Sequence, residues 1–93
     1  MATVKELNTA LALEHIRVLG THGARIQRDD GTSIPLNAEF YHDAVKSCED
    51  SRCVAITYRL SIPEVNEPLL LAAYRDGRVY TGSEETIMRC LDT

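Results

Sequence analysis

Residues Cys53–Ile62 alternate between two kinds of side chain along almost their whole length. The even-numbered positions are apolar, and the positions between them are small or polar. A period of two is typical of a β-strand with one face in a core. This segment constrains the fold most, because it predicts a sheet that packs one face on helices and leaves the other to water or a partner. The apolar positions are Val54, Ile56, Tyr58, Leu60 and Ile62.

Two Asp-Gly turns predict the hairpins that build the rest of this sheet. The first turn, Asp29-Asp30-Gly31, reverses the alternating segment 24–28 into a short strand. Pro35 lies in that returning strand and favours an edge position, because proline donates no ladder hydrogen bond. The second turn, Asp76-Gly77, follows Leu69–Tyr74, which is apolar on both faces as in a central strand.

A capping box at the start of the chain predicts a helix over Val4–Leu19. Thr3 and Glu6 have the required spacing, since a threonine oxygen can accept from a free amide while the glutamate reaches back. Gly20 follows the last apolar pair and predicts a left-handed C-cap. The expected buried stripe is apolar at helical spacing and consists of Val4, Leu7, Leu11 and Val18, with Ala10, Leu13 and Ile16 alongside.

Two further helices are predicted by N-cap residues that follow the two turns at the same distance, Asn37 and Ser83. The first of these helices spans Ala38–Cys48, and the last runs through Leu91. At 93 residues there is room for one core, so we expect a single domain over residues 1–93. The predicted fold class is α+β, with an antiparallel sheet of four to five strands and about three helices packed mainly on one face. A homodimer through the uncovered sheet face fits the same pattern.

The balance of charge disfavours nucleic acid as a partner. The net charge is −4 and the basic residues are scattered, whereas a phosphate-binding surface needs clustered lysine and arginine. The start of the chain lacks the basic and apolar run of a signal peptide, and no stretch is long enough to span a membrane. Three cysteines without a secretory signal favour a reducing setting, so the predicted location is cytoplasmic.

No combination of residues reaches the strength of a catalytic, cofactor or metal signature. Cys48 and Cys53 form the one close pair of thiols, while a structural zinc site needs two such pairs. Cys48 and Cys90 lie among apolar residues late in helices, so we interpret both as small core residues. The adjacent carboxylates Glu49-Asp50 are interpreted as a solvated helix end. We therefore predict no enzyme activity, no cofactor and no metal.

Tyrosine and arginine gather around the second turn and predict a contact surface. Tyr74 and Tyr80 flank the turn and can meet across the hairpin, with Arg75 and Arg78 between them and Arg59 on the neighbouring strand. These residue types are favoured at the centres of protein interfaces. The competing interpretation is ordinary cross-strand pairing on a sheet surface.

These observations favour a non-enzymatic module that binds a protein partner of unknown identity. Its size and acidity resemble, in composition only, small acidic inhibitors or adaptors of phage or mobile-element type. One alternative is a small-ligand binding or sensor domain with a pocket between sheet and helices. The other is a DNA-binding regulator that uses the hairpin with Arg75 and Arg78 as a wing.

Overall fold

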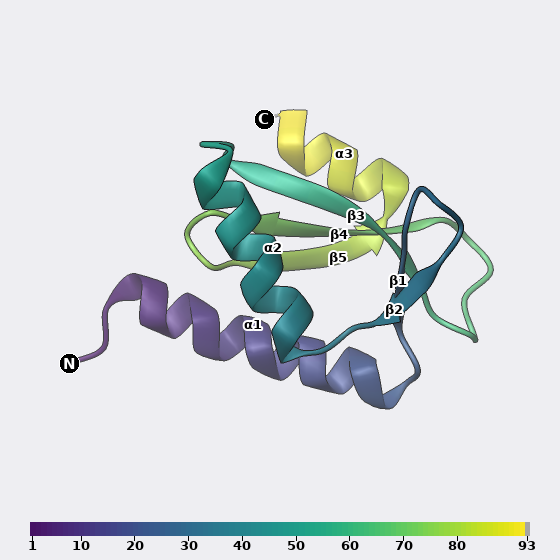
Figure 1. The fold of residues 1–93 in the computed structure, drawn as a ribbon, viewed down its shortest axis with the longest axis horizontal. Coiled ribbons are helices and arrows are strands. Elements are labelled where there is room, and N and C mark those ends of the chain that lie inside the picture. The colour runs from purple at the N-terminus through teal and green to yellow at the C-terminus, as the bar shows by residue number, and fades with distance from the viewer. Residues whose placement is uncertain (93) are drawn as a thin grey trace.

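Five antiparallel strands form one sheet in the order β2-β1-β3-β4-β5 (Figure 1). The computed structural model describes residues 1–92. Every neighbouring pair of strands is antiparallel, so the predicted α+β class with an antiparallel sheet is confirmed. The strands are β1 (Arg25–Gln27), β2 (Ser33–Pro35), β3 (Ala55–Ser61), β4 (Leu69–Tyr74) and β5 (Val79–Ser83), and the helices are α1 (Val4–Thr21), α2 (Ala38–Asp50) and α3 (Glu84–Asp92).

β4 lies inside the sheet between β3 and β5 and is buried almost throughout, as its apolar sequence predicts. Pro35 lies in the edge strand β2, in agreement with its missing donor. The alternating segment is shorter than predicted: it becomes a strand only at Ala55, and Val54 before it stays exposed. The two predicted N-caps are confirmed, because side chains of Asn37 and Ser83 accept hydrogen bonds from backbone amides one turn into α2 and α3.

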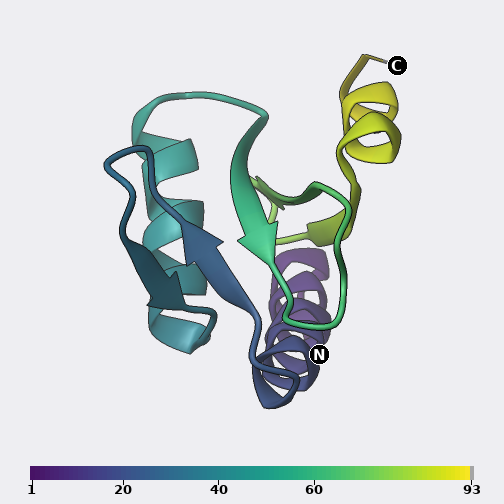
Figure 2. The same ribbon diagram turned by 90° about the vertical axis from the view of Figure 1, so that its right-hand side faces the viewer.

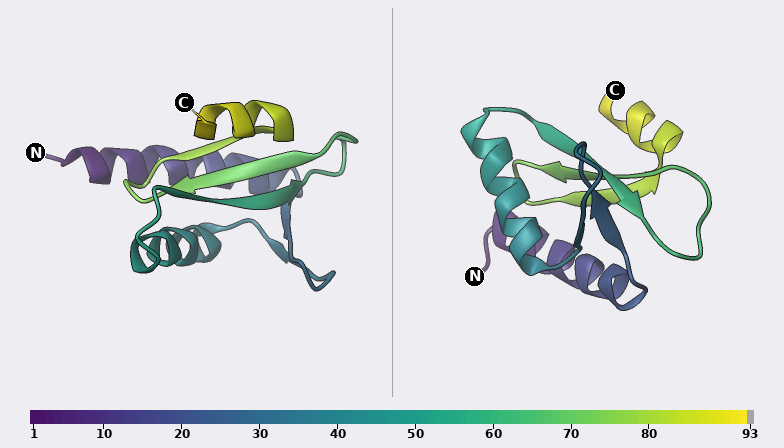
Figure 3. Two further views of the ribbon diagram at one scale, coloured as in Figure 1. Left: turned by 90° about the horizontal axis from the view of Figure 1, so that it is seen from above. Right: turned by 45° about the vertical axis from the view of Figure 1, so that its right-hand side comes forward.

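The helices cover both faces of the sheet unequally, two on one face and one on the other (Figure 3). α1 and α2 share the larger apolar cluster with the face that carries Leu60 and Leu71. α3 packs Ile87 on the opposite face, against Leu70, Ala72 and Tyr74. The prediction of helices mainly on one face is therefore confirmed. α3 covers part of the second face, which the sequence analysis expected to meet water or a partner.

The orientation of α1 corrects the predicted buried stripe. Ala12 and Ile16 are its buried residues, whereas Leu11 is 67% exposed. This side of α1 faces α2, where Tyr41 Oη donates to Thr9 Oγ1 at 3.4 Å. The predicted stripe points away from this contact, and its four main members are exposed: Val4, Leu7, Leu11 and Val18.

The end of α1 also differs from the prediction, because the helix continues through Gly20 to Thr21. A Cβ at Gly20 would lie 3.0 Å from the carbonyl oxygen of Leu36, so this glycine permits close packing. The left-handed conformation falls instead on Gly23, with φ of +79°. The chain then enters β1.

Candidate functional site

The β4–β5 hairpin brings the two predicted tyrosines into contact. The ring centroids of Tyr74 and Tyr80 lie 5.3 Å apart with planes inclined at 75°, an edge-to-face arrangement. Gly77 makes the turn possible with φ of +97°, and its carbonyl oxygen accepts from Tyr41 Oη at 2.8 Å. Asn8 of α1 donates to the Asp76 carbonyl at 3.1 Å. Both neighbouring helices therefore hold the turn.

Arg78 lies across the two rings and is held on three sides. Its guanidinium carbon is 4.6 Å from the centroid of the Tyr74 ring and 5.7 Å from that of Tyr80. Its Nε donates to the Asp76 carboxylate at 2.8 Å, and Nη1 donates to Tyr80 Oη at 3.3 Å. We call Tyr74, Asp76, Arg78 and Tyr80 the hairpin cluster.

Exposure and charge within the hairpin cluster are uneven. Tyr80 is 43% exposed, while Tyr74 is buried beneath Arg78 and against α3. Burial raises the pKa of Tyr74, so its hydroxyl stays neutral at physiological pH. Partial burial opposes ionisation of Asp76, but hydrogen bonds from Arg78 outweigh it and lower the pKa of the carboxyl. The cluster thus presents one aromatic ring and one neutralised ion pair to solvent.

The structure places the other two predicted contact residues elsewhere. Arg75 donates its amide to the Val54 carbonyl at 2.9 Å and lies near Cys48 of α2. Arg78 stacks on Tyr74, whose ring belongs to the cluster on the α3 face, so the two arginines occupy opposite sides of the hairpin. Arg59 pairs with Leu70 at the other end of β4. Three of the five predicted residues therefore meet: Tyr74, Arg78 and Tyr80.

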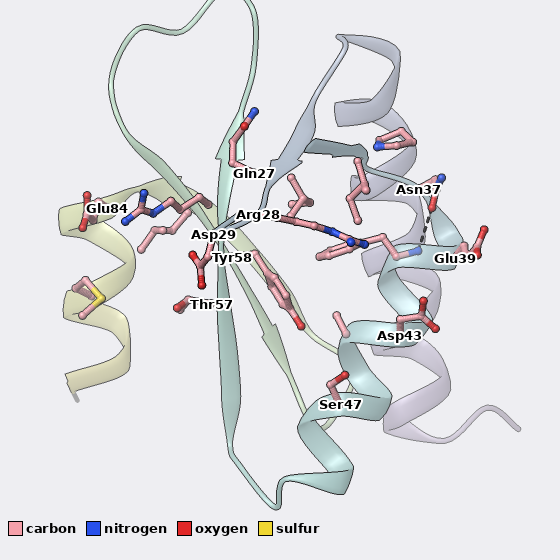
Figure 4. Close-up of a pocket in the computed structure, with 18 residues that line it drawn as sticks. Gln27, Arg28, Asp29, Asn37, Glu39, Asp43, Ser47, Thr57, Tyr58 and Glu84 are labelled. Carbon is pink, nitrogen blue, oxygen red and sulfur yellow. Dashed lines mark hydrogen bonds between the residues drawn. The ribbon is translucent and has the colours of Figure 1, made fainter. Parts of the chain in front are cut away.

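A groove of about 890 Å³ lies beside β3 (Figure 4), between sheet and helix as the small-ligand alternative expects, although Arg59 is the one predicted contact residue that lines it. The β1–β2 hairpin and α2 form its walls, and the edge-to-face pair Phe40–Tyr58, with centroids 4.9 Å apart, lies between them. Figure 4 shows Arg28 reaching from the end of β1 toward the first turn of α2. These residues come from segments far apart in the chain, so no local pattern marks the groove.

Ionisable groups outside these two surfaces have structural roles. Cys48 is fully buried as predicted; burial raises the pKa of its thiol, and the nearby charge of Arg75 offsets this only in part. Cys90 corrects the prediction, because it is exposed. Glu49 accepts from Lys5 at 2.8 Å, which accounts for the acidic end of α2.

Within residues 1–92 no three side chains among histidine, cysteine, aspartate and glutamate are grouped so that they could hold a metal ion. None of the helices in the same range combines the length and apolar character needed to cross a membrane.

Comparisons of the chain with protein-family models, with curated proteins and with solved structures gave no match in any of the three. The hairpin cluster and the groove are therefore the two candidate functional surfaces of the described residues.

Proposed function

We propose that the chain is a non-enzymatic protein-binding module whose contact surface is centred on Arg78 and Tyr80. The observation that supports this is the fixed position of the Arg78 side chain over two aromatic rings. A side chain that is already ordered loses little conformational freedom when a partner binds. Arginine and tyrosine are also the residue types that contribute most at interface centres.

The charge of the chain suits an inhibitor or adaptor that meets a basic surface. A net charge of −4 speeds encounter with a positively charged partner and slows encounter with nucleic acid. The DNA-binding alternative needs a cationic hairpin, but Asp76 neutralises Arg78, and Arg75 lies on the other side. We therefore favour a protein partner over DNA.

The test is affinity capture from a nuclease-treated host lysate with mass spectrometry of the retained proteins. The native chain is expected to retain a partner in stoichiometric amount, and the double variant Arg78→Ala/Tyr80→Ala to lose it. Removing the arginine takes away a cation–π contact, which contributes about 0.5–1 kcal/mol at an exposed site. The double variant must show the native circular dichroism.

The matched control is Arg17→Ala on α1, since Arg17 is also exposed and also pairs with a carboxylate, that of Glu14. This control is expected to retain the partner as the native chain does. Recovery of the chain alone, or equal retention by the double variant, would contradict a contact surface centred on Arg78 and Tyr80.

A further inference from the structure

β3 is longer than its neighbour on one side. Residues 55–60 of β3 pair with β4. On the other side of β3, only residues 59–61 pair with β1. Residues 55–58 therefore pair with no strand of residues 1–92 on the β1 side. Figure 2 shows the β1–β2 hairpin diverging from β3.

The backbone groups of this free edge have a known direction. Val54 accepts from the Arg75 amide, so the backbone of Val54 faces the β4 side. Successive residues of an antiparallel strand direct their amide and carbonyl groups to opposite neighbours. Ala55 and Thr57 therefore direct theirs away from β4, toward the space that β1 leaves. Free edges of this kind pair readily with another extended chain.

The groove lies along this edge and provides room for side chains. Thr57 and Tyr58 both line it, and Phe40 and Ala44 of α2 lie across from Tyr58. In an antiparallel pair, residues opposite one another project to the same face of the sheet. A residue of an added strand opposite Tyr58 would therefore place its side chain on these apolar groups.

The charges of the groove lining favour a basic side chain at the position of the added strand that lies opposite Tyr58. Its lining includes four acidic residues and two arginines, an excess of negative charge. Glu39 and Asp43 are exposed one turn apart on α2, and neither has a cation within 4 Å in the described part of the chain. Burial raises the pKa of Tyr58, and the charge of Asp43 adds to the effect. A lysine or arginine stem would cover the rings while its head reaches these carboxylates.

We propose that this groove binds an extended segment of a partner protein, which adds as a short strand to the free edge at Ala55 and Thr57 and carries a lysine or arginine opposite Tyr58. The hydrogen bonds come from backbone groups, and the basic side chain gives selectivity. This site shares no residue with the hairpin cluster, so the two proposals stand or fall separately.

The experiment is selection from a random dodecapeptide display library on the intact chain and on Thr57→Pro in parallel. The Thr57 amide takes no part in the β3–β4 ladder, so proline there removes the donor that is offered to a partner without breaking a hydrogen bond of that ladder. Peptides with lysine or arginine are expected to be enriched on the native chain. Synthetic copies, followed by fluorescence anisotropy, should bind Thr57→Pro at least about tenfold more weakly.

Two matched variants separate backbone from charge recognition. Thr57→Val keeps the amide and is expected to bind within about twofold of the native chain. Asp43→Asn should weaken binding and reduce its dependence on salt. Arg78→Ala/Tyr80→Ala should bind the peptides as the native chain does. A loss of partner binding at the hairpin cluster is then distinguished from a loss of peptide binding in the groove.

A second measurement covers the case in which Thr57→Pro does not fold. On the native chain, a bound peptide should slow hydrogen exchange at the Thr57 amide, as strand pairing requires. The proposal is overturned if no peptide is enriched, as expected of a groove for small molecules. It is also overturned if folded Thr57→Pro binds equally or if Thr57 exchange is unchanged.

Discussion

Side chains at the β4–β5 hairpin are positioned by local contacts and by distant ones together. Arg78 illustrates this, because Tyr74 and Asp76 fix its direction, and Asn8 and Tyr41 in turn fix the turn that carries them. The surface ion pairs themselves contribute little free energy, about 0–1 kcal/mol each. What they supply is a defined position for a group that would otherwise be mobile.

At the residue scale, Cys48 and Cys53 are expected to differ sharply in reactivity toward iodoacetamide at pH 8. Alkylation requires an accessible thiolate. Cys48 is fully buried, and the raised pKa of its thiol lowers the fraction of thiolate at that pH, whereas Cys53 is exposed. Peptide mass spectrometry should show Cys53 modified in the folded chain and Cys48 modified only in denaturant. Equal modification of both thiols would contradict the burial of Cys48.

The elements differ in how strongly they are bound to the sheet. β3, β4 and β5 pair over most of their lengths, whereas β1 and β2 pair over three residues each. α1 is apolar on more than one side, so both its inner and its outer face contain residues of core type. The side that carries Ala12 and Ile16 packs inward, and the side that carries Leu7 and Leu11 stays exposed.

At the element scale, substitutions on the two sides of α1 should have opposite consequences for stability. Ile16→Ala is expected to lower the free energy of unfolding by about 2–4 kcal/mol, because it leaves a cavity at a side chain that is 1% exposed. Leu11→Ser, on the outer side, should change it by less than about 0.5 kcal/mol. Urea unfolding followed by circular dichroism measures both. A larger cost for Leu11→Ser would mean that the outer stripe is buried.

The whole molecule has two apolar clusters separated by the sheet. The buried residues of the larger one come from α1, α2, the loops beside them and three strands, β1, β3 and β4, and the smaller one joins α3 to β4 through Ile87, with Leu91 alongside. β4 contributes buried residues to both clusters, so it connects them through its two faces. α3 depends on far fewer apolar contacts than the rest of the fold.

At the scale of the whole molecule, Ile87→Ala should release α3 while leaving the larger cluster in place. Ile87 is the buried side chain of α3, and local opening is favoured where few apolar contacts oppose it. Hydrogen exchange is expected to accelerate in residues 84–92 by more than tenfold, equivalent to about 1.4 kcal/mol. The amides of α2 serve as the internal control. Uniform acceleration across both clusters would show that α3 and the main core unfold together.

Part of this architecture follows from the sequence alone, for reasons that are local. The turns at Gly31 and Gly77, the caps at Asn37 and Ser83 and the position of β4 inside the sheet are all predicted, because each depends on neighbouring residues or on burial of both faces. The contact of Tyr74, Arg78 and Tyr80 follows in the same way from hairpin geometry.

Only the tertiary structure decided three further properties. It determined which face of α1 is buried, that Arg59 and Arg75 lie apart from Arg78, and that β1 leaves β3 at Arg59 and exposes the edge beyond. Each property depends on packing between segments distant in sequence, and an apolar pattern says that a side chain can be buried but not against which element. The groove exists for that same reason, because it arises where the twist of a short hairpin carries it away from a longer strand.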